Sequence, residues 1–211
     1  MDMSGSLNST VKACFPNAHR VIDRFHVQHL AFEAVQEIRI KHRWEALEQE
    51  NQEYEQAKRA AVKYEPVRLH NGDTAKQLLA RSRYLLFKHP RLWTREQQRA
   101  ELLFSHYPLI HKSYQLSLRL GEVYRQCKCK EEAFKKLALW YNDVEETGIL
   151  SFKTVARTIR THYLGILNFF NNRATNAAAE SFNAKIKSFR NALRGVRDVE
   201  FFLYRLTKLY A

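Results

Sequence analysis

A single acidic residue, Glu180, stands within a basic, asparagine-rich stretch of the chain, RATNAAAESFNAKIKSFRNALRG, which spans residues 173–195. If this stretch is a helix, spacings of three and four residues place Glu180 on one face with four polar or basic side chains, namely Asn183, Lys187, Arg190 and Arg194. Carboxylates bind divalent metal ions, and Lys and Arg bind phosphates, so such a face suits metal-dependent chemistry on a phosphodiester.

The alternative for Glu180 is an ordinary surface carboxylate that pairs with a neighbouring cation and with the positive end of the helix dipole. The residues three and four positions away on either side are Asn176, Ala177, Asn183 and Ala184. Because none of them is basic, the partner of Glu180 is expected outside its own helix. That partner is either a metal ion or a donor from another element.

Two further acidic residues lie near the start of the chain. Asp2 precedes a turn in MDMSG. Within HRVIDRF (residues 19–25), Asp23 ends a short predicted strand, three residues before His26. An acid at the end of a strand is a common position for a metal ligand in α/β nuclease folds. Alternatively, Asp23 caps a helix that begins near Phe25, and His26 bonds to the backbone at that helix start. Both interpretations stay open.

The elements that must position these residues are mostly helical, because the chain has only 6 Gly and 4 Pro and long stretches lack both. Two β-branched residues after a Pro-Asn turn signal predict one short strand within residues 19–25, and this strand ends at Asp23. From His26 onwards the apolar period becomes helical. Helices are predicted over residues 4–14, 26–54, 74–88, 95–106, 108–126, 130–146 and 151–171.

The helix that carries Glu180 has recognisable ends. Thr175 or Asn176 is a suitable N-cap, and Gly195 is a suitable stop. Within the helix, Phe182, Ile186, Phe189 and Leu193 recur at spacings of four, three and four. This spacing predicts a buried apolar stripe opposite the polar face.

The net charge of the chain indicates which class of partner it binds. Over 211 residues the formal net charge is +13 and the pI about 9.8, which is typical of a protein that meets a polyanion, most often nucleic acid, although a solvated basic surface is the alternative. The three cysteines lack a disulfide framework, and Cys127 and Cys129 form a lone C-x-C that we interpret as two ordinary thiols. No apolar run approaches membrane-spanning length, so we expect a cytoplasmic protein with no membrane partner.

Two segments together resemble one family. AHRVIDRFHVQHL and TNAAAESFNAKIKSFRNALRG look like the C-terminal part of bacterial insertion-sequence transposases of the ISL3 type, and the resemblance runs over essentially the whole chain. It implies a mainly α fold with a small α/β portion, in which a partial RNase H-like fold is interrupted by a large helical insertion. The implied division is a core portion over residues 1–39, a helical insertion over residues 40–170, and the last core helices over residues 171–211.

The resemblance also implies a DDE active site. Asp2 matches the second carboxylate and Glu180 the third, and both would bind Mg²⁺ or Mn²⁺ for phosphodiester cleavage and strand transfer in DNA transposition. Asp23 and His26 match a supporting D-x-x-H motif. The row of Asn183, Lys187, Arg190 and Arg194 would line the path of the DNA. Transposon ends and target DNA are the implied partners, and an oligomer of this chain on DNA is compatible with them.

The first carboxylate of the family pattern would lie upstream of Asp2. We therefore expect this chain to be a C-terminal fragment that is inactive by itself, and whether it is an enzyme alone stays open. A different class of function remains as the alternative, a non-catalytic helical protein that binds nucleic acid through its basic face. Divalent metal binding near Asp2 and Glu180 separates the two hypotheses.

Overall fold

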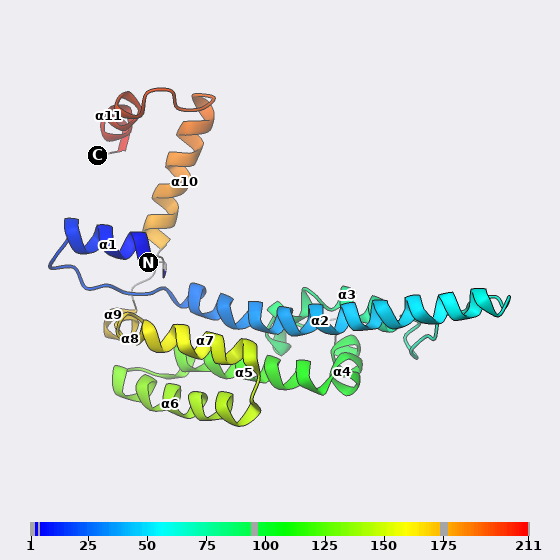
Figure 1. Ribbon diagram of the computed structural model, residues 1–211. Coiled ribbons are helices and arrows are strands. Elements are labelled where there is room, and N and C mark those ends of the chain that lie inside the picture. Colours follow the sequence, from blue (N-terminus) through cyan, green and yellow to red (C-terminus); the bar gives the residue numbers. More distant parts are fainter. Residues whose placement is uncertain (1–2, 4, 94–96, 174–176, 211) are drawn as a thin grey trace.

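The computed structural model describes residues 3, 5–93, 97–173 and 177–210, and they are mainly helical (Figure 1). The helices and two 3₁₀ turns are α1 (Gly5–Cys14), α2 (Arg24–Arg59), α3 (Ala75–Arg81), η1 (Leu85–Phe87), η2 (Pro90–Leu92), α4 (Gln97–His106), α5 (Pro108–Gln126), α6 (Lys130–Thr147), α7 (Leu150–Thr161), α8 (Tyr163–Leu167), α9 (Phe169–Asn172), α10 (Ala177–Ala192) and α11 (Val199–Tyr210). Within the described ranges, no helix is long and apolar enough to cross a membrane.

The helix α2 is the longest element, with 36 residues, and it organises the body formed by α2–α9. Its N-terminal half packs against α3, α5 and α7, while its C-terminal end extends past the other helices (Figure 1). Val27, Ala31 and Val35 on this half are fully buried in the core. The predicted domain boundary between residues 39 and 40 falls inside α2, which continues through it without a break.

A buried cation ties α2 to the segment that follows it. Arg39 donates a hydrogen bond to the Gln36 side chain (2.6 Å) and another to the Leu79 carbonyl (2.9 Å). Gln36 in turn donates to the Arg83 carbonyl (3.0 Å). Burial, followed by the nearby charges of Arg43 and Arg83, lowers the pKa of Arg39. Neutral acceptors satisfy this guanidinium, so the contact fixes α3 on α2 without requiring a buried carboxylate.

The short strand predicted within residues 19–25 is wrong, since the described residues contain no strand. Instead, the chain before α2 lies along α8. The Ile22 amide donates to the Gly165 carbonyl (2.9 Å), and the Asn168 side chain donates to the Arg20 carbonyl (2.8 Å). A Cβ at Gly165 would lie 3.1 Å from the Ile22 side chain. Val21 and Ile22 therefore lie against a helix and not in a sheet. The backbone groups of this segment need hydrogen-bond partners, and Gly165 and Asn168 supply them.

Two predicted helices are broken into shorter pieces. The helix predicted over residues 151–171 ends at Thr161, because His162 leaves helical geometry (φ −109°, ψ 14°), and α8 and α9 follow. The helix predicted over residues 74–88 ends at Arg81, and a 3₁₀ turn follows. The predictions for α1, α4, α5 and α6 are confirmed within a few residues.

The last two helices, α10 and α11, form a C-terminal hairpin (residues 177–210) that stands off the body (Figure 1). The predicted burial of the α10 stripe is wrong: Phe182 and Leu193 are 45% and 46% exposed. Among the described residues, α11 covers part of the stripe. There the Phe189 and Phe202 rings stack at 5.4 Å.

Candidate functional site

Three basic residues gather at the C-terminal end of α10, and the last of them, Arg194, follows the helix. Lys187, Arg190 and Arg194 line one hollow of about 550 Å³, together with Asn191 and Gly195. All three cations are exposed, and in the described ranges none has a carboxylate within ion-pair distance. The hollow therefore presents a cluster of uncompensated positive charge to solvent.

Local geometry at the end of α10 shapes this hollow. Arg194 and Gly195 both adopt positive φ (54° and 116°), and the Gly195 amide donates to the Arg190 carbonyl (3.2 Å). Such a left-handed ending closes a helix and turns the chain back over its last turn. The predicted stop at Gly195 is thus confirmed, and Arg194 and Arg190 line the same hollow where the helix ends.

The acidic end of the same helix is described less fully. Glu180 lies in the first turn of α10, on the helix predicted for it, but the structure does not describe its side chain. Asn183 lies exposed on α10 between Glu180 and the basic hollow. Asp2 lies outside the described residues, as do the predicted caps Thr175 and Asn176. The joint metal site of Asp2 and Glu180 therefore stays a prediction.

Asp23 has a structural role at the start of α2. It is 8% exposed, and its carboxylate accepts a hydrogen bond from the Phe25 amide (2.8 Å), which makes it the N-cap of the helix. The sequence left this capping role open beside a role as metal ligand. His26 is half-buried in the first turn, with its ring at the edge of the Phe25 ring. Among the described residues, no three His, Cys, Asp or Glu side chains lie close enough to hold a metal ion together.

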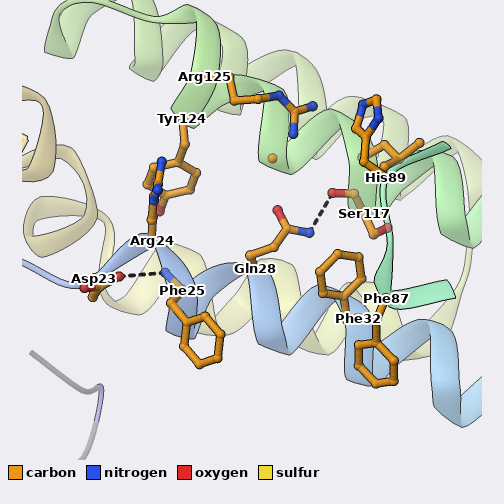
Figure 2. Close-up of a pocket in the computed structure, with 12 residues that line it drawn as sticks. Asp23, Arg24, Phe25, Gln28, Phe32, Phe87, His89, Ser117, Tyr124 and Arg125 are labelled. Atoms are coloured by element: carbon orange, nitrogen blue, oxygen red, sulfur yellow. Dashed lines mark hydrogen bonds between the residues drawn. The ribbon is translucent and has the colours of Figure 1, made fainter. Parts of the chain in front are cut away.

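The sequence did not predict a cavity of about 620 Å³ that begins beside Asp23 (Figure 2). Its walls come from the start of α2, the segment 87–89 and the C-terminal half of α5. Because these segments are distant in sequence, no motif spacing connects them. The available signal was Gly121, an isolated glycine within a predicted helix, which often marks a close approach.

Comparison with known proteins shows the family to which this chain belongs. Residues 1–206 match the family model described as Transposase, of the ISL3 type. This chain belongs to the ISL3-type transposase family. It is also 25% identical, over 211 residues, to the transposase for insertion sequence element IS1001 of Bordetella parapertussis.

That alignment includes 98% of this chain but 45% of the relative. The chain thus spans less than half the length of the transposase that it matches. No solved structure matches it. The resemblance inferred from the D-x-x-H and T-N-x3-E motifs is therefore confirmed at the level of the family, while the activity of the whole enzyme remains to be proposed.

Proposed function

We propose that this chain is the C-terminal part of a DDE transposase, which cleaves phosphodiesters and joins strands during DNA transposition. The observation that carries the proposal is the basic hollow at the end of α10, in a chain of the transposase family. There three cations that have no carboxylate partner among the described residues follow Glu180 within a short stretch of the sequence. Lys187, Arg190 and Arg194 would hold successive phosphates of DNA. Asn183 would contact the DNA backbone closer to the phosphodiester bond that is cleaved.

The donor chemistry of the proposed acids suits a divalent metal, because Mg²⁺ and Mn²⁺ prefer carboxylate oxygens. Asp2 and Glu180 would hold the metal, and Asp23 and His26 would support the site from the start of α2. Bound metal ions would activate the attacking water or 3′-hydroxyl and stabilise the leaving oxygen. The capping bond of Asp23 is compatible with this support, since it fixes where α2 begins.

The domain division remains part of this proposal. Residues 1–39 and 171–211 would belong to a partial RNase H-like core, and residues 40–170 would form the helical insertion. Because α2 crosses the first boundary, the insertion would begin as the continuation of a helix that starts at the D-x-x-H motif. The helix α2 would then fix where the insertion lies relative to Asp23.

DNA binding tests the proposal directly. Replacing Lys187, Arg190 and Arg194 by Ala removes three cations from the hollow, and the matched control replaces Lys58, Arg59 and Lys63, three exposed cations beyond the packed part of α2. Both variants lose the same charge. If the hollow binds DNA, the first variant loses about 0.9 units of salt slope per phosphate contact and about 10²-fold in affinity near physiological salt. Equal slopes in the two variants would contradict the proposal.

Catalysis by this chain alone is tested separately. We expect no strand cleavage from the 211-residue chain on DNA that carries the ends of its own element, in Mg²⁺ or Mn²⁺. Asp2 and Glu180 supply two carboxylates where the proposed site uses three, and misplaced groups cost on the order of 10²-fold in rate. Metal-dependent cleavage that disappears on Glu180→Gln would show that another acid completes the site, with Asp23 as the first candidate.

A further inference from the structure

The cavity between α2 and α5 contains an unusual buried group. Tyr124 is 3% exposed, its ring packs against Phe169 (5.4 Å) and Phe170 (5.6 Å), and its hydroxyl has no hydrogen-bond partner among the described residues. Burial, with a smaller effect of the Asp23 charge, raises the pKa of Tyr124, so the hydroxyl keeps its proton and remains a donor. A buried donor without a partner is costly, which points to a ligand that accepts from it.

A second polar group is held in place in the same cavity. The Gln28 side chain donates to the Ser117 carbonyl (3.0 Å), which fixes the orientation of its amide (Figure 2). Its Oε1 lies where a Cβ at Gly121 would be only 2.7 Å away. Gly121 therefore makes room for this oxygen, and a larger residue would displace it. The cavity thus offers a fixed acceptor from Gln28 and a fixed donor from Tyr124.

Cations and a neutral histidine surround these groups. Arg24 and Arg125 both line the cavity, and Figure 2 shows Arg24 beside Tyr124 with His89 at the opposite end. The His89 Nδ1 accepts from the Arg91 amide (3.2 Å), and burial followed by the charges of Arg125 and Arg91 lowers its pKa. The neutral ring then carries its proton on Nε2. The two guanidinium groups outnumber the single carboxylate of Asp23 in the lining, so the cavity favours a negatively charged ligand.

Aromatic rings complete the walls. Phe25 is one of the lining residues and is 65% exposed, with its ring stacked on His29 at 6.0 Å. Phe32 and Phe87 meet edge to face at 5.6 Å. Planar bases stack on such rings regardless of their identity, and guanidinium groups bind the adjoining phosphate. A volume of about 620 Å³ lies in the range of pockets that enclose small ligands.

We infer that this cavity binds a single unpaired nucleotide. The base stacks against the phenylalanine wall, its edge donates to Gln28 and accepts from Tyr124, and its phosphate pairs with Arg24 and Arg125. Two sources share this chemistry: a free mononucleotide and one nucleotide of a DNA strand that is outside the duplex. Only the second source rests on the proposed function, because only it requires that the chain binds DNA.

The test uses the fluorescence of 2-aminopurine, which falls when the base stacks. One arm titrates the protein with the deoxynucleoside monophosphate of 2-aminopurine. The second uses an oligonucleotide duplex with 2-aminopurine in an unpaired 3′ overhang, and the third uses the same base paired within a blunt duplex. We expect quenching in the overhang arm, little in the blunt duplex, and weaker binding of the monophosphate than of the overhang. Quenching by the monophosphate alone would support the site but assign it to free nucleotides.

Variants identify the cavity as the place of binding. Arg125→Ala and Tyr124→Phe should each weaken binding about tenfold, since each removes a hydrogen bond to the ligand, and Gly121→Ala should weaken it by displacing Gln28. The control is Arg119→Ala, which removes an exposed arginine of α5 that pairs with Asp143 outside the cavity. Tyr124→Phe keeps the shape of the side chain, so it remains informative if Gly121→Ala fails to fold.

The outcomes separate this inference from the proposed function. Absence of quenching in every arm, or equal affinity in Tyr124→Phe, Arg125→Ala and the wild type, would overturn the nucleotide site. If salt-sensitive duplex binding through Lys187, Arg190 and Arg194 persists in that case, the proposed function stands. Conversely, quenching by the monophosphate without any duplex binding would retain the cavity site and reject the proposed function.

Discussion

The helical body and the C-terminal hairpin contain similar residues but use them in opposite ways. The body buries a large core, which includes Trp140, Tyr114 and Phe152, although side chains such as Trp44 and Phe25 are exposed. The hairpin buries Phe202 and Leu206 but exposes many other large apolar side chains, namely Phe182, Leu193, Val199, Phe201, Leu203, Tyr204, Leu209 and Tyr210. An exposed apolar surface on this scale marks a place where another surface packs.

This difference suggests how the two regions depend on other parts of the protein. The body has its own core and can be stable by itself. The hairpin has helical sequence and a basic hollow, yet its apolar face lacks a complete cover within the described residues. If the chain forms part of an RNase H-like core, as we propose, this face would be the surface that packs on the rest of that core.

The sharpest test of this comparison is a pair of phenylalanine substitutions. Phe152→Ala in the fully buried core should lower the free energy of unfolding by about 3–5 kcal/mol. Phe201→Ala in the hairpin, where the ring is 56% exposed, should change it by less than about 0.5 kcal/mol. Urea denaturation followed by circular dichroism measures both. Comparable losses of stability in the two variants would mean that the hairpin is already packed in solution. The proposed difference between the body and the hairpin would then be wrong.

Metal binding tests whether the hairpin contributes a ligand. Glu180→Gln should weaken Mn²⁺ binding, followed by electron paramagnetic resonance, by about tenfold or more, because a neutral amide replaces an anionic ligand. Glu200→Gln changes an acid in the first turn of α11 and provides the matched control. If both variants bind Mn²⁺ like the wild type, the hairpin is a nucleic-acid-binding element without a metal site.

The start of the body can be tested at Asp23. Asp23→Ala removes the bond to the Phe25 amide and should destabilise the body by about 1 kcal/mol, as loss of an N-cap does. Asp23→Asn keeps an acceptor and should restore most of this loss. If the Asn variant restores stability but not the activity of the full-length enzyme, Asp23 has a second role beyond the cap. Full recovery of both would leave capping as its whole contribution.

The smallest expected effect is at Tyr124. Tyr124→Phe removes a buried hydroxyl without a partner and should stabilise the body by up to about 1 kcal/mol near pH 7. The pKa of Tyr124 is raised by folding, so the unfolded chain loses this proton first and the wild type loses stability as the pH rises above about 10. The advantage of the variant should therefore grow at high pH. Thermal melts between pH 7 and 11 measure it, and a destabilised variant would mean that the hydroxyl is already satisfied.

The sequence by itself determined the features that depend on neighbours along the chain. The helical period predicted α4, α5 and α6, and Gly195 predicted the end of α10 through a left-handed turn that glycine adopts easily. The motifs around Asp23 and Glu180 identified the family, which the match over residues 1–206 confirms. Asp23 was recognised as important, and capping was one of the two roles weighed for it.

Only the tertiary structure decided the features that depend on distant partners. Val21 and Ile22 suggested a strand, but their segment bonds to α8, since a strand needs a neighbouring strand that the described residues do not supply. The stripe of α10 has helical spacing whether or not anything covers it, so spacing could not reveal its exposure. The nucleotide cavity joins Gln28, His89 and Tyr124 across three segments, and no local pattern encodes their distance because packing alone brings them together.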